Sequence, residues 1–356
     1  MADVRRTRLR RHGLTVLRIC VVAALYFGSA EVGLLQELVR SQVTPLWPPS
    51  GIALAALLLC GARVWPGIAL GAFLANVSLG PSLVAVLVIT AGNTLAPVCS
   101  YALLCRAGFR VRLDRLRDAL SLILLGAFTG MLVSATTGTT TLLLAGVLDE
   151  GFWPTWSVWW TGDAMGVLVV TPVLLVLRSA RWPKHVPASR WAEALLLMAA
   201  TAGVGLVETS SSPLLFLGFP LLIWAAFRFQ LAGAAPCALA VSTFTIVSAA
   251  RGAGPFAGHD LLTSMIALQA FNGSAALTSL LVGAVISRRN QTEREIARAC
   301  GQLAEVVAGI TTADQRLGLP GEEDEHDGRD KRPERVERVE RVERVERTRQ
   351  RPSPRI

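Results

Sequence analysis

The chain has 356 residues, of which 52% are hydrophobic and only 17% are charged, and its formal net charge is +9. Soluble domains carry about 25% charged residues, so this composition argues against a single soluble core. It also excludes a disordered or collagen-like protein for the bulk of the chain. The apolar residues form runs close to the length of about 17 to 25 residues that crosses a bilayer. The sequence therefore predicts an all-α, polytopic integral membrane protein.

The net charge points to topology rather than to nucleic acid. Residues 320–356 hold 11 basic and 11 acidic residues, so the whole excess of positive charge lies in residues 1–319. A basic chain can bind nucleic acid, but Lys and Arg also gather in the cytoplasmic loops of membrane proteins. We therefore expect the lipid bilayer as a partner and no nucleic acid.

Ten apolar segments follow one another along the chain. They are Leu14–Leu35, Leu46–Ala62, Val64–Leu79, Leu83–Cys105, Ala119–Leu144, Trp156–Leu177, Ala192–Val207, Leu214–Phe229, Ala232–Ala250 and Leu261–Ile286. Several are only about 16 residues long, and short apolar pieces can be re-entrant instead of spanning. We therefore predict a helical bundle with 8–10 transmembrane helices.

The charges of the loops predict the orientation of the bundle. With ten spans, one set of alternate loops carries 19 Lys and Arg residues and the other set carries 2, Arg40 and Arg251. Because the basic loops are cytoplasmic, both termini are expected in the cytoplasm. Residues 1–13 then form a basic cytoplasmic N-terminus and residues 14–287 the membrane domain. Cleavage after a signal peptide near Ala30 is the alternative, but the apolar run is followed by more membrane segments.

The character of the sequence changes after the last apolar segment. Residues 288–319 predict a polar cytoplasmic helix that is interrupted at Gly301 and Gly309. Residues 320–356 combine an acidic patch with a Glu-Arg-Val repeat over Glu334–Glu346, which is typical of a disordered, charged, low-complexity tail. A docking helix with Glu–Arg pairs four residues apart is the alternative interpretation of the repeat.

One carboxylate stands inside a predicted span. Asp163 belongs to the run Trp160-Thr161-Gly162-Asp163, about a third of the way into its segment from the outer end. Ionisable residues are costly in a bilayer and are therefore paired, protonated or functional. Asp163 either binds a ligand or senses protons, or it is a structural carboxylate bonded to a neighbouring helix.

Two further motifs place polar groups near span ends or within spans. Trp47-Pro48-Pro49-Ser50-Gly51 opens the second segment, where proline is suited to starting a helix and tryptophan to the membrane interface. Asn76 and the run Gly92-Asn93-Thr94 place amides inside spans, where such groups usually hydrogen-bond across helices. Direct contact with a ligand is the alternative for both motifs.

Three Gly-xxx-Gly pairs, which begin at Gly67, Gly126 and Gly162, predict close helix packing within the bundle or between protomers of a homodimer. No constellation predicts catalysis. The four histidines have no metal-ligand spacing, none of the six cysteines forms a CxxC pair, and the sequence contains no phosphate-binding GxxxxGK[ST] loop. We therefore predict no enzyme activity and no catalytic, cofactor-binding or metal site.

Taken in order, the motifs LWPPSGIALAALLL, WPGIALGAFLANV, GNT, WWTGDAMGVLVVTP and FPLLIWAAFRFQLAGAA resemble those of the MASE family of membrane-associated sensor domains, first type. The resemblance covers about residues 14–290 and ends at Arg288-Arg289. It implies a multi-pass sensor region of the bacterial inner membrane, drawn with about eight helices. Its motif positions here are Trp47 to Gly51, Asn76, Gly92 to Thr94, Trp160, Gly162 and Asp163.

Members of that family are usually fused to diguanylate cyclase, phosphodiesterase, PAS or histidine-kinase modules, and no such module is expected in the 69 residues after the membrane domain 14–287. We therefore predict a sensory or regulatory protein that acts through a separate kinase, cyclase or transporter. A small-solute permease is the alternative, because Pro97, Pro172 and Pro236 fall within segments and broken helices are typical of transporters.

Overall fold

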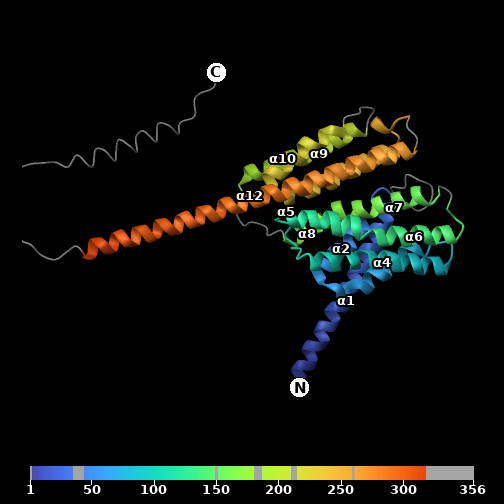
Figure 1. The fold of residues 1–356 in the computed structure, drawn as a ribbon, viewed down its shortest axis with the longest axis horizontal. Helices are drawn as coiled ribbons and strands as arrows, with labels where there is room; N and C mark the ends of the chain where they lie inside the picture. The colour runs from blue at the N-terminus through green and yellow to red at the C-terminus, as the bar shows by residue number, and fades with distance from the viewer. Residues whose placement is uncertain are drawn as a thin grey trace, which may run out of the picture. The chain divides into compact units, whose positions relative to one another are not determined.

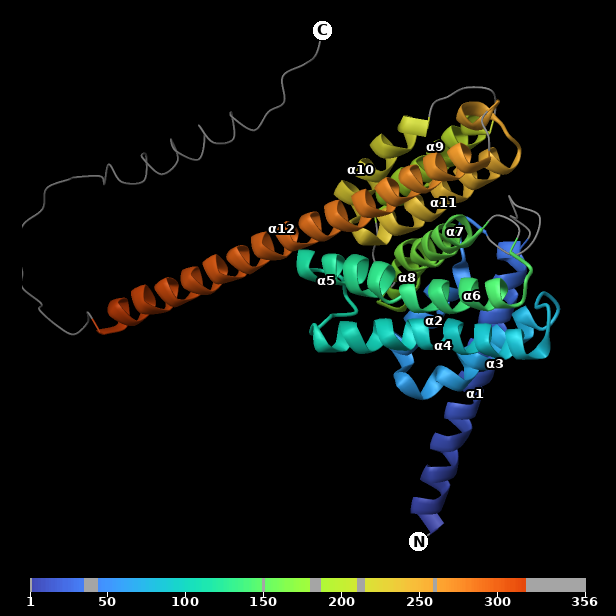
Figure 2. The ribbon, with the colours of Figure 1, turned by 45° about the vertical axis from the view of Figure 1, so that its right-hand side comes forward.

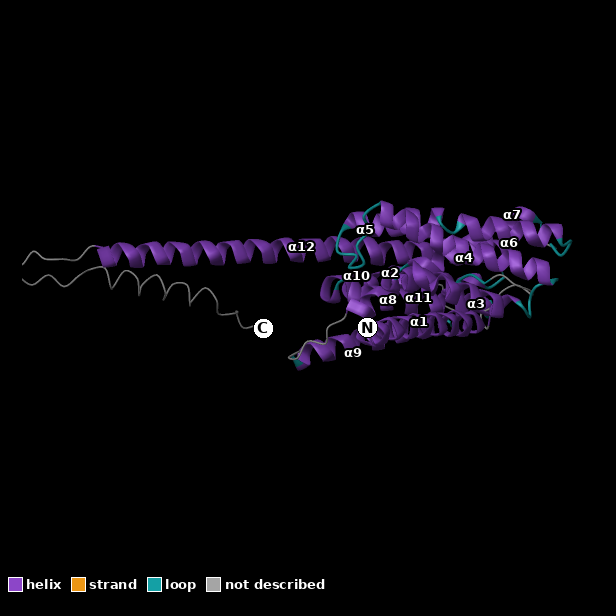
Figure 3. Ribbon diagram, turned by 90° about the horizontal axis from the view of Figure 1, so that it is seen from below, coloured by secondary structure: helices purple, strands orange, loops and turns teal. Residues whose placement is uncertain are grey.

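The computed structural model describes residues 2–34, 44–148, 151–179, 187–209, 215–258 and 261–317. Within these ranges the chain forms helices, turns and loops, and no strand (Figure 3). The all-α prediction is therefore confirmed for the part of the chain that is described. The predicted Glu-Arg-Val repeat lies outside the described residues.

Twelve α-helices follow one another in the described ranges (Figure 1). They are α1 Ala2–Leu34, α2 Pro48–Cys60, α3 Trp65–Asn76, α4 Leu83–Arg106, α5 Leu116–Ser121, α6 Leu132–Leu144, α7 Phe152–Met165, α8 Thr171–Ser179, α9 Ala188–Glu208, α10 Gly218–Phe229, α11 Leu231–Ala250 and α12 Leu261–Leu317. Short 3₁₀ turns stand at Ala62–Val64, Leu215–Leu217 and Gly254–Phe256.

Seven helical stretches among the described residues are long and apolar enough to cross a bilayer, which confirms the helical membrane bundle. They are Gly13–Leu34, Leu83–Arg106, Leu116–Leu144, Phe152–Arg178, Ala188–Glu208, Leu231–Phe256 and Thr263–Gly309. The three remaining predicted segments also form helices, but these helices are short. Helix α2 has 13 residues, and α3 and α10 have 12 residues each.

Two of the long stretches contain π-helical segments. Leu122–Thr129 joins α5 to α6, and Gly166–Val170 joins α7 to α8. Extra residues inserted in a helix in this way redirect the side chains beyond them, and such segments are frequent at functional sites. The second segment begins three residues after Asp163, so it is placed to set the direction of that part of the helix.

The helices of the membrane domain pack in neighbouring pairs (Figures 1 and 2). α1 packs on α2 and α3, α4 packs on α3 and α6, and α7 packs on α6. Farther along the chain, α11 packs on both α9 and α10. The side chain of Arg228 donates hydrogen bonds to Glu193, which ties α10 to α9.

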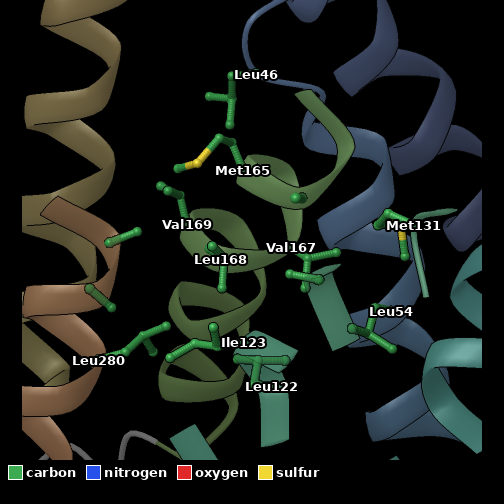
Figure 4. Packing of buried hydrophobic residues seen from close by; sticks show 14 of the residues in the cluster. Leu46, Leu54, Leu122, Ile123, Met131, Met165, Val167, Leu168, Val169 and Leu280 are labelled. Carbon is green, nitrogen blue, oxygen red and sulfur yellow. The ribbon is translucent and has the colours of Figure 1, made fainter. Parts of the chain in front are cut away.

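Apolar side chains fill the space between these helices. The largest cluster joins residues of α2, the two π-helical segments and α12, and includes Leu54, Leu122, Leu168 and Leu280 (Figure 4). A second cluster lies between α9, α10, α11 and α12, and a third between α1, α2 and α3. These clusters hold the polar motifs of the sequence in fixed positions relative to one another.

The interruption that was predicted after the last span is absent, because α12 is one helix of 57 residues from Leu261 to Leu317. Gly301 and Gly309 both lie within it and have open space where a side chain would project. A single glycine costs a helix only about 1 kcal/mol relative to alanine, which neighbouring helix-forming residues offset. The chain divides into a compact unit Met1–Ile296 and a second unit Ala297–Ile356.

Proline also fails to break two helices. Pro97 lies inside α4 and Pro236 inside α11, and both helices continue beyond them. Pro172 lies at the second position of α8, directly after a π-helical segment. Because α8 continues the stretch Phe152–Arg178, Pro172 lies within a continuous helix, at a point where the π-helical segment already departs from regular α-helical hydrogen bonding.

Candidate functional site

The motifs around Trp47 and Asp163 meet where α2 begins beside α7 and the π-helical segment that follows α7. The backbone N–H of Trp47 donates to the carbonyl of Gly162 over 3.0 Å. A Cβ atom on Gly51 would meet the carbonyl oxygen of Gly166, and one on Gly166 would meet the carbonyl oxygen of Trp47. Glycine is therefore required at this crossing because backbone touches backbone.

The start of α2 explains this approach. The helix begins at Pro48, with Pro49 behind it, as the sequence predicted for a proline-led helix start. The hydroxyl of Thr171 donates to the carbonyl of Gly51 over 3.0 Å and fastens α8 to the first turn of α2. The amide of Gln269 in α12 donates to the carbonyl of Pro45 over 3.0 Å, so the loop before α2 is held from a second side.

Asp163 lies at the centre of this crossing and is only 1% exposed. Its Oδ1 atom accepts a hydrogen bond from the hydroxyl of Ser50, on the first turn of α2. Among the described residues, no group hydrogen-bonds its second oxygen, Oδ2. The carboxylate therefore links α7 to α2, and the side chains of Ser134 and Trp159 also lie close to it.

A chain of hydrogen bonds lies beside the carboxylate. The indole N–H of Trp159 donates to Ser134 over 3.2 Å, and the hydroxyl of Ser134 donates to the amide oxygen of Asn93 over 2.7 Å. These bonds join α7, α6 and α4. The expectation that an amide within a span bonds across helices is thus confirmed for Asn93.

A cavity of about 40 Å³ opens between these elements. It is lined by Thr44, Trp47, Asn76, Leu79, Gly80, Ile89, Asn93, Trp159 and Asp163. A water molecule needs at least about 10–15 Å³, so the cavity has room for water or a small ion but is smaller than the roughly 300 Å³ of a metabolite site. The structure therefore brings three separate predicted motifs to one cavity, whose wall combines polar and apolar residues.

Three predicted residues have other roles. Asn76 lines the cavity, but its side-chain amide donates to the carbonyl of Ala72 within its own helix over 2.8 Å. The expectation that it bonds another helix is wrong for this donor, because Asn76 is the last residue of α3 and reaches its own last turn. Thr94 donates to the carbonyl of Thr90 over 2.7 Å, and Gly92 faces Thr137 closely.

The two adjacent tryptophans of α7, Trp159 and Trp160, have different surroundings in the structure. Trp159 lines the cavity, whereas the indole N–H of Trp160 donates to the carbonyl of Phe128 over 2.9 Å. The ring of Trp160 stacks on Trp156, with ring centroids 5.6 Å apart. Trp160 therefore serves helix packing, and its neighbour is the residue that reaches the candidate site.

Glu208 is a second buried carboxylate, and the sequence analysis missed it. It is the last residue of α9 and is 1% exposed. Its backbone carbonyl accepts from Ser248 over 2.8 Å, while among the described residues its Oε1 atom has no partner. The sequence does contain a pattern that could have indicated its burial, because Glu208 continues the helical spacing of Thr201 and Gly205 along the buried face of α9.

The side chains of the candidate site are suited to binding a ligand. It offers a carboxylate, two amides, hydroxyl groups and two indoles, which can hold a small polar or charged species. In the described part of the chain, no three His, Cys, Asp or Glu side chains gather as a metal site. Five helices, α2, α3, α4, α6 and α7, contribute to the cavity or its hydrogen bonds, so a change in its occupant would affect the packing of all of them.

Comparison with known proteins gives one family. The MASE1 family model matches residues 16–290, which is most of the chain. No curated protein and no solved structure gives a match.

Proposed function

This chain belongs to the MASE1 family of membrane-associated sensory domains, and from that premise we propose that it senses a signal at the Asp163 cavity and passes it to a separate signalling protein. One observation carries the proposal, namely the meeting of three motifs around a buried carboxylate that has one unpaired oxygen. The protein works as a multi-pass sensor in the bacterial inner membrane and has no catalytic step of its own.

Occupation of the cavity is coupled to helix packing. Asp163 and Ser50 join α7 to α2, and Ser134 and Asn93 join α6 to α4. A signal can shift the bundle only if it binds one arrangement of these helices more tightly than another. Because the α2–α7 crossing is backbone against backbone, a small displacement there cannot be absorbed by side chains and is passed to neighbouring helices.

The signal leaves through the C-terminal part of α12. Within the unit that starts at Ala297, Leu303, Val306 and Val307 are 65%, 58% and 62% exposed. They lie on one side of the helix, and the charged residues Arg298 and Glu305 lie on the other side. An exposed apolar stripe of this kind is typical of a helix that docks a protein partner.

Photo-crosslinking in the native host tests this route. A photoreactive amino acid at Leu303 or Val306 is expected to give a discrete adduct with a second protein, and the same group at Glu305 is the matched control with at least severalfold less adduct. Asp163→Asn is expected to change the adduct yield at Leu303 while the protein still inserts into the membrane, because the variant alters the cavity and leaves the stripe intact.

Two outcomes would overturn the proposal. An adduct of twice the 38.0 kDa chain mass would identify a second copy as the neighbour of the stripe in place of a separate signalling protein. Accumulation of a radiolabelled solute by vesicles that contain the purified protein, without any adduct at Leu303 or Val306, would identify a permease.

A further inference from the structure

Among the described residues that line it, the Asp163 cavity has one negative group and no positive group. Asp163 lines the cavity and is 1% exposed, and its Oδ2 atom has no hydrogen-bond partner among the described residues. None of the residues that line the cavity is Lys, Arg or His. Because an ionised carboxylate away from water is costly unless it is neutralised, the cavity favours a positively charged occupant.

The remaining wall suits a hard cation. Asn76, Asn93 and Thr44, whose side chains each carry an oxygen atom, line the cavity in addition to the carboxylate, and the oxygen of Asn93 already accepts from Ser134. Alkali and alkaline-earth cations bind oxygen ligands of these types. The indoles of Trp47 and Trp159 also line the cavity, and aromatic faces attract cations.

Size and charge narrow the class of ligand. A cavity of about 40 Å³ admits an ion or a few waters and excludes a metabolite. Asp163 is the one carboxylate among the lining residues, and it balances a single positive charge. Divalent cations in proteins usually receive several carboxylates, which this wall lacks.

We propose that the Asp163 cavity binds a monovalent alkali cation, such as sodium, and that this cation is the species whose occupancy the sensor detects. The inference rests on the proposed sensory function and names the ligand class of the same site. The cation would contact the Oδ2 atom of Asp163 and leave the Ser50 hydrogen bond to Oδ1 in place.

Thermal unfolding of the purified full chain in detergent provides the test. Sodium chloride replaces choline chloride stepwise at constant ionic strength and pH, and tryptophan fluorescence follows unfolding. The Tm of the wild type is expected to rise saturably, by a few degrees, because a ligand that binds only the folded state stabilises it. The rise is expected to vanish in Asp163→Asn and to persist in Glu208→Gln, which alters the other buried carboxylate.

A second variant tests cation binding without changing the carboxylate of Asp163. Asn76→Ala is expected to raise the sodium concentration at half-maximal effect roughly tenfold, since it removes one ligand oxygen and keeps Asp163. A wild-type Tm that does not respond to sodium, potassium or lithium would overturn the inference. A Tm that responds to pH in choline buffer and to no alkali cation would identify the proton as the occupant and would also overturn it.

Failure of this inference is distinguishable from failure of the proposed function. If the alkali cations have no effect but Asp163→Asn still changes the photo-adduct at Leu303, the cavity senses another species and only the ligand class is wrong. If the adduct is absent, the sensory proposal fails irrespective of the titration.

Discussion

At the scale of single residues, the candidate site depends on a few polar groups that join different helices. Ser50 and Asp163 are 113 positions apart in the chain, and Asn93 and Ser134 are 41 apart. Buried hydrogen bonds of this kind contribute modestly when made, but a group left without its partner is destabilising. The neighbouring Thr94, by contrast, satisfies its hydroxyl on its own helix at the carbonyl of Thr90.

This contrast predicts different costs for two adjacent substitutions in α4. Asn93→Ala removes the acceptor of Ser134 and is expected to lower the free energy of unfolding by about 1–3 kcal/mol. Thr94→Val keeps the shape of the side chain and is expected to cost less than about 1 kcal/mol, because only a bond within the helix is lost. Denaturant unfolding in detergent measures both, and equal costs would show that the bond between helices contributes nothing.

At the scale of secondary-structure elements, glycine positions decide which helices can cross. The Gly-xxx-Gly prediction of close helix packing is confirmed at all three places. Gly162 and Gly166 face the backbone of Thr44 and Trp47, and Gly67 and Gly71 in α3 face Ile19 and Tyr26 in α1. At the third pair, Gly126 lies in a π-helical segment and its carbonyl accepts a hydrogen bond from Ser100 of α4 over 2.8 Å. A Cβ atom on Gly130 would meet the hydroxyl of that same Ser100.

The α2–α7 crossing is therefore expected to be intolerant of a single methyl group. Gly166→Ala places a Cβ atom against the carbonyl oxygen of Trp47, and is expected to destabilise the folded protein by about 1–3 kcal/mol or more. Gly203→Ala in α9 is the matched control, because nothing lies within 4 Å of its added Cβ atom. It is expected to be neutral or slightly stabilising.

Thermal unfolding and the folded fraction in size-exclusion chromatography measure both glycine variants. Equal behaviour of Gly166→Ala and Gly203→Ala would show that the crossing can relax. It would then also contradict the transmission of a displacement from the cavity through this contact.

At the scale of the whole molecule, the loop charges predict on which side of the membrane each part lies. Both termini are expected in the cytoplasm, together with the exposed Cys300 in α12. The turn after α11, which contains Arg251 and Gly252, is expected on the outer side. The Asp163 cavity, which the turn after α3 borders at Leu79 and Gly80, is expected near that same outer side.

Cysteine accessibility in intact cells tests this orientation. A membrane-impermeant maleimide is expected to label Gly252→Cys in intact cells, and to label Cys300 only after the cells are permeabilised. A Cys300→Ser background separates the two signals. Labelling of Cys300 in intact cells, without labelling of Gly252→Cys, would invert the topology and place the proposed docking stripe outside the cell.

The sequence alone determined the class of this protein and most of its helices. Long apolar runs predict helices because a backbone inside a bilayer must satisfy its own hydrogen bonds, and this rule needs no tertiary contact. The motifs around Trp47 and Asp163 also stood out without a structure, since charged and proline-rich groups are rare within spans. Length and composition left the number of spans open, because several apolar segments are close to the lower limit for crossing a bilayer. In the structure these segments correspond to the short helices α2, α3 and α10.

Only the tertiary structure decided which residues meet. Trp159 and Trp160 are the same type of residue in the same helix, and the packing of α6 and of the segment that holds Phe128 determines which indole reaches the cavity. Glu208 lies at the polar end of its segment, and its burial depends on α11. Contacts between distant segments arise from the packing of whole helices, and no local pattern encodes the partner that a polar group finds there.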